Sequence, residues 1–355
     1  MDQLSYLDHF YLSLFSTKQS KKMSTIYHIL TGKKTASILY SAEKYQLTHF
    51  FALFSKLDRN QFNNSIQKLI NLNTLLLAEE TQEYYLSENG KNKQSEFFSE
   101  HYYPKELNHL KDGLVLIHFW RTLQLVTQVL SEIRYKNKQY IPIEKEWEKQ
   151  NWVKQWFKNN AMNKDQLALD FGQEWIIILN DLPELNAEII AANLTGHSNT
   201  GKTKNQLVEA FKKESSEISI IELDSIAWIT KILKKHPEKI PLFYSVYNEM
   251  LHLYDGTTKS ALLTKRYLLN GYSLAEIAAQ RQLKESTINE HVIEISIMDP
   301  LFDLSVVLPS EKLKKLKHLL SENPTITYQE LIKKNPEILF LWYRLAQIER
   351  NRDSD

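Results

Sequence analysis

One segment of the 355-residue chain has the residue types and spacing of a phosphate-binding loop. Residues 196–203 read Gly-His-Ser-Asn-Thr-Gly-Lys-Thr, which fits the pattern G-x4-G-K-T. In such a loop the backbone N–H groups surround a phosphate, which requires a buried strand before the loop and a helix after it. The preceding residues 187–194 (AEIIAANL) have a helical composition instead. The sequence therefore favours a simple loop in which Thr203 caps the next helix, and we expect the protein not to be an enzyme.

Side chains that bind metals or act as nucleophiles show no informative spacing. His101, His109 and His118 are eight and nine residues apart, whereas a pair of metal ligands on one helix needs a spacing of about three to five. The chain contains no cysteine, which excludes disulfides, thiolate nucleophiles and Cys-ligated zinc or iron–sulfur centres. We therefore expect neither a metal nor any other cofactor.

Residues 260–296 have the spacing of a helix-turn-helix. A first helix is predicted over 260–270 and ends at Gly271, a residue that suits the left-handed conformation after a helix. Ser273 and Glu276 have the spacing of a capping box, which predicts the start of a second helix. Leu283 fills the next turn, and a third helix is predicted from about residue 285. The inward-facing positions are predicted to be Leu274, Ile277, Ala278, Ile288, Val292 and Ile295.

This string resembles the helix-turn-helix of LuxR-type regulators, and it is still more similar to the helicase helix-turn-helix module at the C-terminus of many RecQ-type helicases. The matching positions are Gly271, Ser273, Glu276, Ile277, Ala278, Arg281, Leu283, Ser286, Thr287, Ile288 and His291. The whole chain resembles the YpbB family of low-GC Gram-positive bacteria. That family has this module at its end and a Tyr-His-x-Leu-x-Gly-Lys-Lys-Thr segment near its start, here residues 27–35. The resemblance implies an accessory protein with a RecQ-type helicase as its partner, and it implies no particular reaction.

The candidate DNA contacts lie on and beside the third predicted helix. Cations that would meet phosphates are Lys265, Arg266, Arg281, Lys284, Lys312, Lys314, Lys315 and Lys317, and side chains that would face base edges are Ser286, Thr287, Asn289 and His291. Phosphate contacts need clustered cations, but residues 256–355 hold 14 Lys and Arg against 13 Asp and Glu. We therefore expect DNA binding that is weak or specific for a DNA structure. Two alternatives stay open: the same surface docks a protein, or the chain is a helix-turn-helix transcription regulator.

The composition predicts a mainly α protein, because only 8 glycines and 9 prolines interrupt 355 residues. Two short β-prone runs, 75–77 and 83–86, follow three predicted helices and indicate a small β-hairpin. That order, with Tyr-Leu-Ser-Glu-x-Gly at residues 85–90, resembles a winged helix. We expect three domains: residues 1–92 with the winged-helix-like unit, residues 93–255 as a central helical domain, and residues 256–355 as the helix-turn-helix domain. An exposed break at Asp255-Gly256 is expected to separate the last two.

The net charge of +1 is lower than that of most general nucleic-acid-binding proteins. The first 15 residues carry Asp2 and Asp8 and lack the basic segment of a signal peptide. The longest apolar runs, such as 114–117 and 175–179, are far shorter than the roughly 20 residues that span a bilayer. We therefore expect a soluble, cytoplasmic protein that makes no membrane contact.

Overall fold

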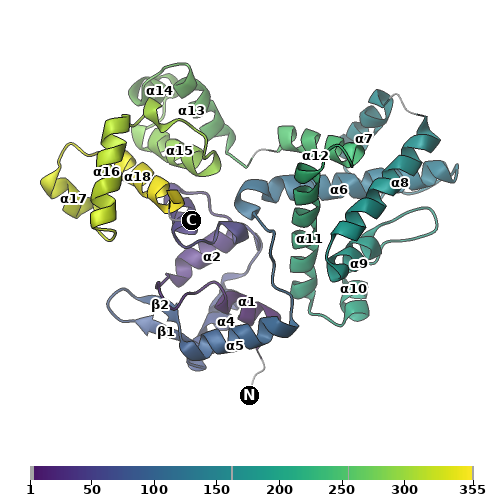
Figure 1. Ribbon diagram of the computed structural model, residues 1–355, viewed down its shortest axis with the longest axis horizontal. Helices are drawn as coiled ribbons and strands as arrows, with labels where there is room; N and C mark the ends of the chain where they lie inside the picture. Colours follow the sequence, from purple (N-terminus) through teal and green to yellow (C-terminus); the bar gives the residue numbers. More distant parts are fainter. Residues whose placement is uncertain (1–3, 161–162, 255, 354–355) are drawn as a thin grey trace.

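The computed structural model describes residues 4–160, 163–254 and 256–353. Helices dominate these ranges, as predicted, and their one sheet is a two-stranded antiparallel hairpin. Figure 1 shows three groups of helices: an N-terminal group at the bottom, a central group on the right and a C-terminal group at the upper left. None of the described helices has the length and apolar character needed to cross a membrane.

The N-terminal group contains the predicted hairpin, and the expected order of helices before it is confirmed. Its elements are α1 (Tyr6–Leu12), α2 (Met23–Thr31), α3 (Ala36–Lys44), the 3-10 turn η1 (Thr48–Phe50), α4 (Arg59–Asn71), β1 (Leu75–Ala78), β2 (Glu83–Leu86) and α5 (Glu88–Glu100). Leu75 pairs with Leu86 across the hairpin, and both are buried. Lys21 adds an isolated antiparallel bridge to Tyr84 on the other edge of β2, so the preceding loop is fixed against the hairpin.

The turn after α2 is one of the few places that require a glycine. Gly32 ends α2 with φ +78°, a left-handed conformation that side chains disfavour. A Cβ atom there would also lie 2.5 Å from Ala52 Cβ. The segment around η1 therefore packs directly on the turn.

The central group is built around one long helix, as the sequence predicted. Its elements are α6 (His109–Arg134), α7 (Trp147–Asn159), α8 (Lys164–Asp181), α9 (Glu184–Asn193), α10 (Lys204–Phe211), α11 (Ser215–Lys235) and α12 (Pro241–Leu253). α6 packs against α7, α8, α11 and α12. The buried Glu174 carboxylate of α8 accepts the amides of Leu242 and Phe243 at 2.9 and 2.8 Å, and so stabilises the start of α12.

A buried carboxylate joins the central group to the segment that leads into it. Asp224 on α11 is 0% exposed and accepts the Tyr102 hydroxyl at 2.5 Å. It also accepts the amides of Lys105 and Glu106 at 3.0 and 2.8 Å. Because a buried charge needs such donors, Asp224 fixes the path of residues 102–106.

The C-terminal group packs directly on the N-terminal group. Its elements are α13 (Lys259–Leu269), α14 (Leu274–Arg281), α15 (Glu285–Met298), the 3-10 turn η2 (Leu304–Val306), α16 (Ser310–Glu322), α17 (Tyr328–Lys334) and α18 (Phe340–Asp353). Both α15 and α18 contact α3, and the C-terminal end of the chain lies beside the N-terminal helices in Figure 1. One continuous hydrophobic cluster includes residues of all three groups.

The expected break between the central and C-terminal groups is not exposed at Gly256. Asp255 lies outside the described residues, whereas Gly256 is buried, and a Cβ there would lie 2.6 Å from Met298 Cε and 3.0 Å from Lys111 O. The Lys34 ammonium donates to Gly256 O at 2.5 Å. The sequence expectation of an exposed linker was therefore wrong at this position, because three groups of helices meet there.

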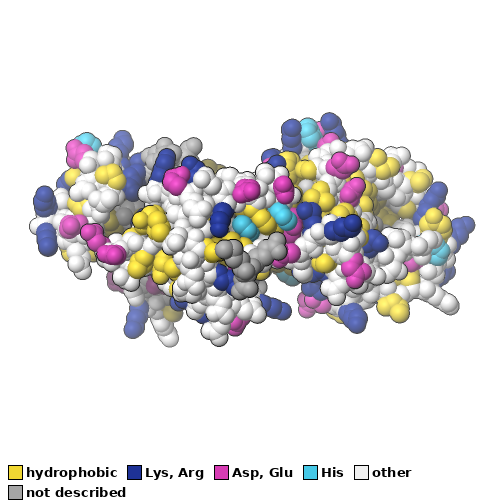
Figure 2. Space-filling model, turned by 90° about the horizontal axis from the view of Figure 1, so that it is seen from below, with side chains coloured by type: hydrophobic (Ala, Val, Ile, Leu, Met, Phe, Trp, Pro, Cys, Tyr) yellow, Lys and Arg dark blue, Asp and Glu magenta, His cyan; other side chains and the backbone are white. Residues whose placement is uncertain are grey.

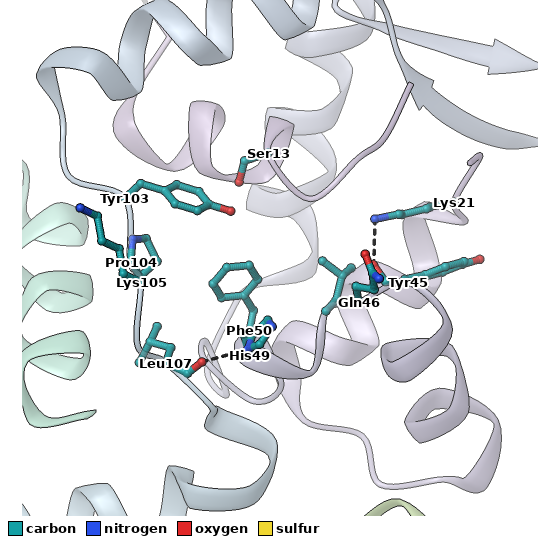
Figure 3. A pocket seen from close by; sticks show the side chains of 11 residues that line it. Ser13, Lys21, Tyr45, Gln46, His49, Phe50, Tyr103, Pro104, Lys105 and Leu107 are labelled. Carbon is teal, nitrogen blue, oxygen red and sulfur yellow. Dashed lines mark hydrogen bonds between the residues drawn. The ribbon is translucent and has the colours of Figure 1, made fainter. Parts of the chain in front are cut away.

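A small cavity marks the contact between the N-terminal group and residues 103–107 (Figure 3). Its volume is about 280 Å³. Lys21 lines it, and its ammonium donates to Leu14 O at 2.7 Å and to Tyr45 O at 3.2 Å. The side chain is 5% exposed and burial lowers its pKa to about 8. Two carbonyl acceptors give Lys21 a structural role, since they join the loop before α2 to the residue after α3.

The stability of the protein is expected to rise between pH 8 and about pH 9.5, because Lys21 is harder to protonate in the folded chain than in the unfolded one. In that window the unfolded state binds more protons, so raising the pH favours the folded state, by roughly 1–2 kcal/mol. Urea unfolding at several pH values measures this. Lys21→Met should abolish the rise, and the exposed neighbour variant Lys22→Met should retain it. An equal rise in Lys21→Met would contradict the assignment.

Candidate nucleic-acid interface

The helices α13, α14 and α15 form the tri-helical unit that the sequence predicted. Gly271 has φ +84°, and Ser273 and Glu276 make the reciprocal hydrogen bonds of a capping box at the start of α14. Ile277 and Ile288 are 0% exposed and lie in the shared core. The short α14 and the tight turns follow directly from these local signals.

The second half of α15 is buried on all sides, which leaves only its first turns for a ligand. Residues 291–297 are all buried, between α13 and α14 on one side and α3 and α18 on the other. Within this stretch Glu294 accepts the backbone N–H of Thr258 at 2.6 Å and its hydroxyl at 3.0 Å, and thereby fixes the start of α13. Because helix-turn-helix proteins contact bases with the N-terminal residues of the third helix, the exposed end is the relevant one.

Two candidate contacts, Arg281 and His291, are brought together inside the domain. The Arg281 guanidinium donates to Ser260 O at 2.9 Å, to Ser260 Oγ at 2.7 Å and to the Thr264 hydroxyl. Since arginine has no acceptor, Thr264 Oγ1 accepts from it and donates its own hydrogen to His291 Nδ1, 2.9 Å away. Burial and the Arg281 charge lower the pKa of His291. This network holds α13, α14 and α15 together.

The other candidate cations differ in their partners and in their exposure. Lys265 pairs with Asp299 at 2.8 Å. Lys312 lies 4.1 Å from the centre of the Trp342 ring, and Lys315 is 3.9 Å from Glu337. On the surface are the exposed Arg266, Lys284 and Lys314 and the half-buried Lys317. Lys284 is the cation nearest in sequence to the first turn of α15, where it is the N-cap residue.

The exposed end of α15 carries polar and acidic side chains. Ser286 is exposed, Thr287 and Asn289 are half-buried, and the exposed Glu285 and Glu290 are acidic. The two glutamates beside Lys284 match weak phosphate contact better than tight recognition. On another face of the molecule, seen from below in Figure 2, Lys and Arg side chains are likewise scattered among Asp and Glu side chains.

A second polar helix surface escaped the sequence analysis. α4 precedes the hairpin and contains no acidic residue. Its exposed side chains include Asn60, Gln61, Asn64, Gln67 and Lys68, and amide side chains of this kind pair with adenine edges in a major groove. Spacings of three and four residues between these amides were the available signal in the sequence.

The loop that fits the phosphate-binding pattern uses its amides internally. The helix α9 precedes it, and Thr203 forms a capping box with Gln206 at the start of α10. The hydrogen bonds run from Gly196 N to Asn199 O, His197 N to Ser131 Oγ, Gly201 N to Thr195 Oγ1, Lys202 N to Ala192 O and Thr203 N to Gln206 Oε1. A phosphate needs such amides to be available, so this loop has the structure of a helix connection.

The purified protein is expected to release no phosphate from ATP, with or without DNA, because most of the loop's amides, including those of Gly201, Lys202 and Thr203, are already engaged. A colorimetric phosphate assay measures this, and Lys202→Ala serves as the matched variant. Turnover that disappears in Lys202→Ala would contradict the expectation and assign nucleotide chemistry to the loop.

Comparisons with known proteins agree with the geometry. Residues 260–341 match the family described as "Helix-turn-helix domain". The C-terminal group is a helix-turn-helix domain. The chain is also similar to Protein YpbB of Bacillus subtilis (strain 168), with 25% identity over 311 residues that cover 87% of each chain. The predicted resemblance to the YpbB family is therefore confirmed. No solved structure matches this chain.

Proposed function

We propose that this YpbB-like chain is a non-enzymatic DNA-binding accessory protein that acts with a RecQ-type helicase. The observation that carries the proposal is the helix-turn-helix domain at residues 260–341, whose third helix α15 exposes its first turns to solvent. A second unit, α2 to α4 followed by the hairpin, has the order of a winged helix. Two such units in one chain favour an accessory protein over a transcription regulator.

The DNA contact is proposed to be weak and to respond to DNA structure more than to sequence. Glu285 and Glu290 repel phosphates beside the exposed end of α15, and Lys284 is the adjacent cation. A dedicated reader gains about 1–3 kcal/mol at each base pair from paired donors and acceptors. Ser286 and Asn289 offer too few such donors and acceptors for a dedicated reader. Together with the acidic neighbours, this disfavours a sequence-specific transcription regulator.

The helicase partner rests on the resemblance between residues 271–291 and the helicase helix-turn-helix. RecQ-type helicases often carry a winged helix, a helical module and sometimes this same helix-turn-helix after their motor. A separate chain with a similar order of parts would supply them to a short helicase. Co-elution with a purified RecQ-type helicase in size-exclusion chromatography tests this part, and separate elution at micromolar concentrations would overturn it.

Lys284→Gln is expected to weaken binding to duplex and forked DNA several-fold and to lower the slope of log K against log salt by about one unit, as the loss of one phosphate contact does. Fluorescence anisotropy at low and moderate salt measures this. Lys154→Gln on α7, an exposed lysine far along the chain, is the matched control. Absence of binding to duplex and forked DNA at low salt would overturn the DNA part of the proposal.

A further inference from the structure

A groove of about 660 Å³ lies where the N-terminal and C-terminal groups meet. α3 contributes Tyr40 and Lys44 to its wall, and α18 contributes Phe340, Tyr343, Arg344 and Arg350. We call it the Arg344 groove. Its volume falls within the range of roughly 300–1,000 Å³ that is typical of ligand sites, and none of its lining residues is Asp or Glu.

The guanidinium of Arg344 has no counter-charge in the part of the chain that the structure describes. Its Nη1 donates to Gln347 Oε1 at 3.0 Å, the side chain also hydrogen-bonds to Tyr40, and the rings of Tyr40 and Phe340 lie beside it. The side chain is half-buried, and burial lowers its pKa. Since a desolvated cation is costly without an anion, the groove is suited to a negatively charged group, with exposed Lys44 beside it.

Aromatic rings surround this cation. Arg344 Cζ lies 3.7 Å from the centre of the Tyr40 ring and 5.2 Å from that of Phe340. Phe340 is 45% exposed, and its ring centre is 5.3 Å from that of Tyr328. Exposed rings and guanidinium planes are the surfaces on which unpaired bases stack.

An unused amide donor adds a third kind of contact. Asn351 lines the groove, and its Nδ2 is buried with no hydrogen-bond partner among the described residues. A buried donor without an acceptor costs free energy. The carbonyl or ring nitrogen of a base is an acceptor that would satisfy it.

We propose that the Arg344 groove binds an unpaired nucleotide of single-stranded DNA, with the base against Phe340 and the phosphate at Lys44 and Arg344. An acidic peptide would use the cations and leave the rings and the Asn351 amide unused, so the three features together favour a nucleotide. The proposal rests on the proposed DNA-binding function and deepens it, because it names the part of the DNA that this groove holds.

Phe340→Ala is expected to weaken binding of the full chain to a fluorescent dT oligonucleotide by about tenfold, the loss of one base–aromatic stack. Lys44→Gln should weaken it several-fold and lower its salt dependence. Trp147→Ala on α7, which removes a 71% exposed ring elsewhere, and Lys154→Gln are the matched controls. Phe340 and Lys44 are exposed, so both variants should keep the melting temperature of the parent chain.

The arms of the experiment separate the possible results. Competition by dTMP alone at micromolar concentration would identify a free nucleotide, and not a strand, as the ligand and overturn the proposal. Parental oligonucleotide affinity in both Phe340→Ala and Lys44→Gln would overturn it as well, and so would a chain that binds duplex but no single strand. Loss of duplex binding in Lys284→Gln concerns the helix-turn-helix alone, so the two proposals fail independently.

Discussion

Asp224→Ala should lower the free energy of unfolding by about 3–5 kcal/mol, the largest loss we expect from a single truncation in this chain. The substitution leaves the Tyr102 hydroxyl and two backbone amides without the carboxylate that they share at 2.5–3.0 Å. These donors would stay buried, because Asp224 on α11 is 0% exposed and lies against residues 102–106. Urea denaturation followed by far-UV circular dichroism measures the change.

Two further variants sharpen this experiment. Asp224→Asn keeps one acceptor oxygen and should lose less than the alanine variant. Glu188→Ala removes an exposed carboxylate from α9 and should change stability by less than about 0.5 kcal/mol. A loss in Asp224→Ala no greater than that of Glu188→Ala would show that residues 102–106 are held by other contacts.

Ala278→Arg is expected to disrupt the C-terminal group at a cost above about 3 kcal/mol, because a long charged side chain would enter the space between α14 and α15. Ala278 is 7% exposed, and its small size allows the two helices to approach. Since α15 also packs on α3, the damage should spread to the N-terminal group. Hydrogen exchange measured by mass spectrometry should show lost protection in both α15 and α3.

The adjacent residue supplies the control for this prediction. Ala279 is on the same helix and is exposed, so Ala279→Arg should keep parental exchange rates. Protection that is lost in α15 but retained in α3 would show that the two groups unfold independently, against the continuous core. Unchanged protection in both helices would contradict the packing of Ala278.

The local signals of the sequence were sufficient for the helices and their ends. The capping box of Ser273 and Glu276, the left-handed Gly271 and the β-prone runs of the hairpin each act over a few residues. Such signals depend on backbone hydrogen bonding and on conformational entropy. A local pattern can also mislead. Residues 196–203 fit the phosphate-loop pattern, but the helix α9 precedes them where such a loop needs a strand, so the loop has another geometry.

The candidate DNA-binding residues and the Arg344 groove depend on contacts between residues that are far apart in the chain. Arg281 and His291 are residue types that often contact DNA. Only the fold shows that Thr264 and Ser260 hydrogen-bond to them. No spacing in the sequence relates Tyr40 to Arg344, about three hundred positions later, because side-chain burial and ion pairing arise from tertiary packing. The sequence by itself determined the helices, the hairpin and the helix-turn-helix. The tertiary structure decided which cations remain exposed and where the Arg344 groove forms, because both follow from the packing of α15 and α18 on α3.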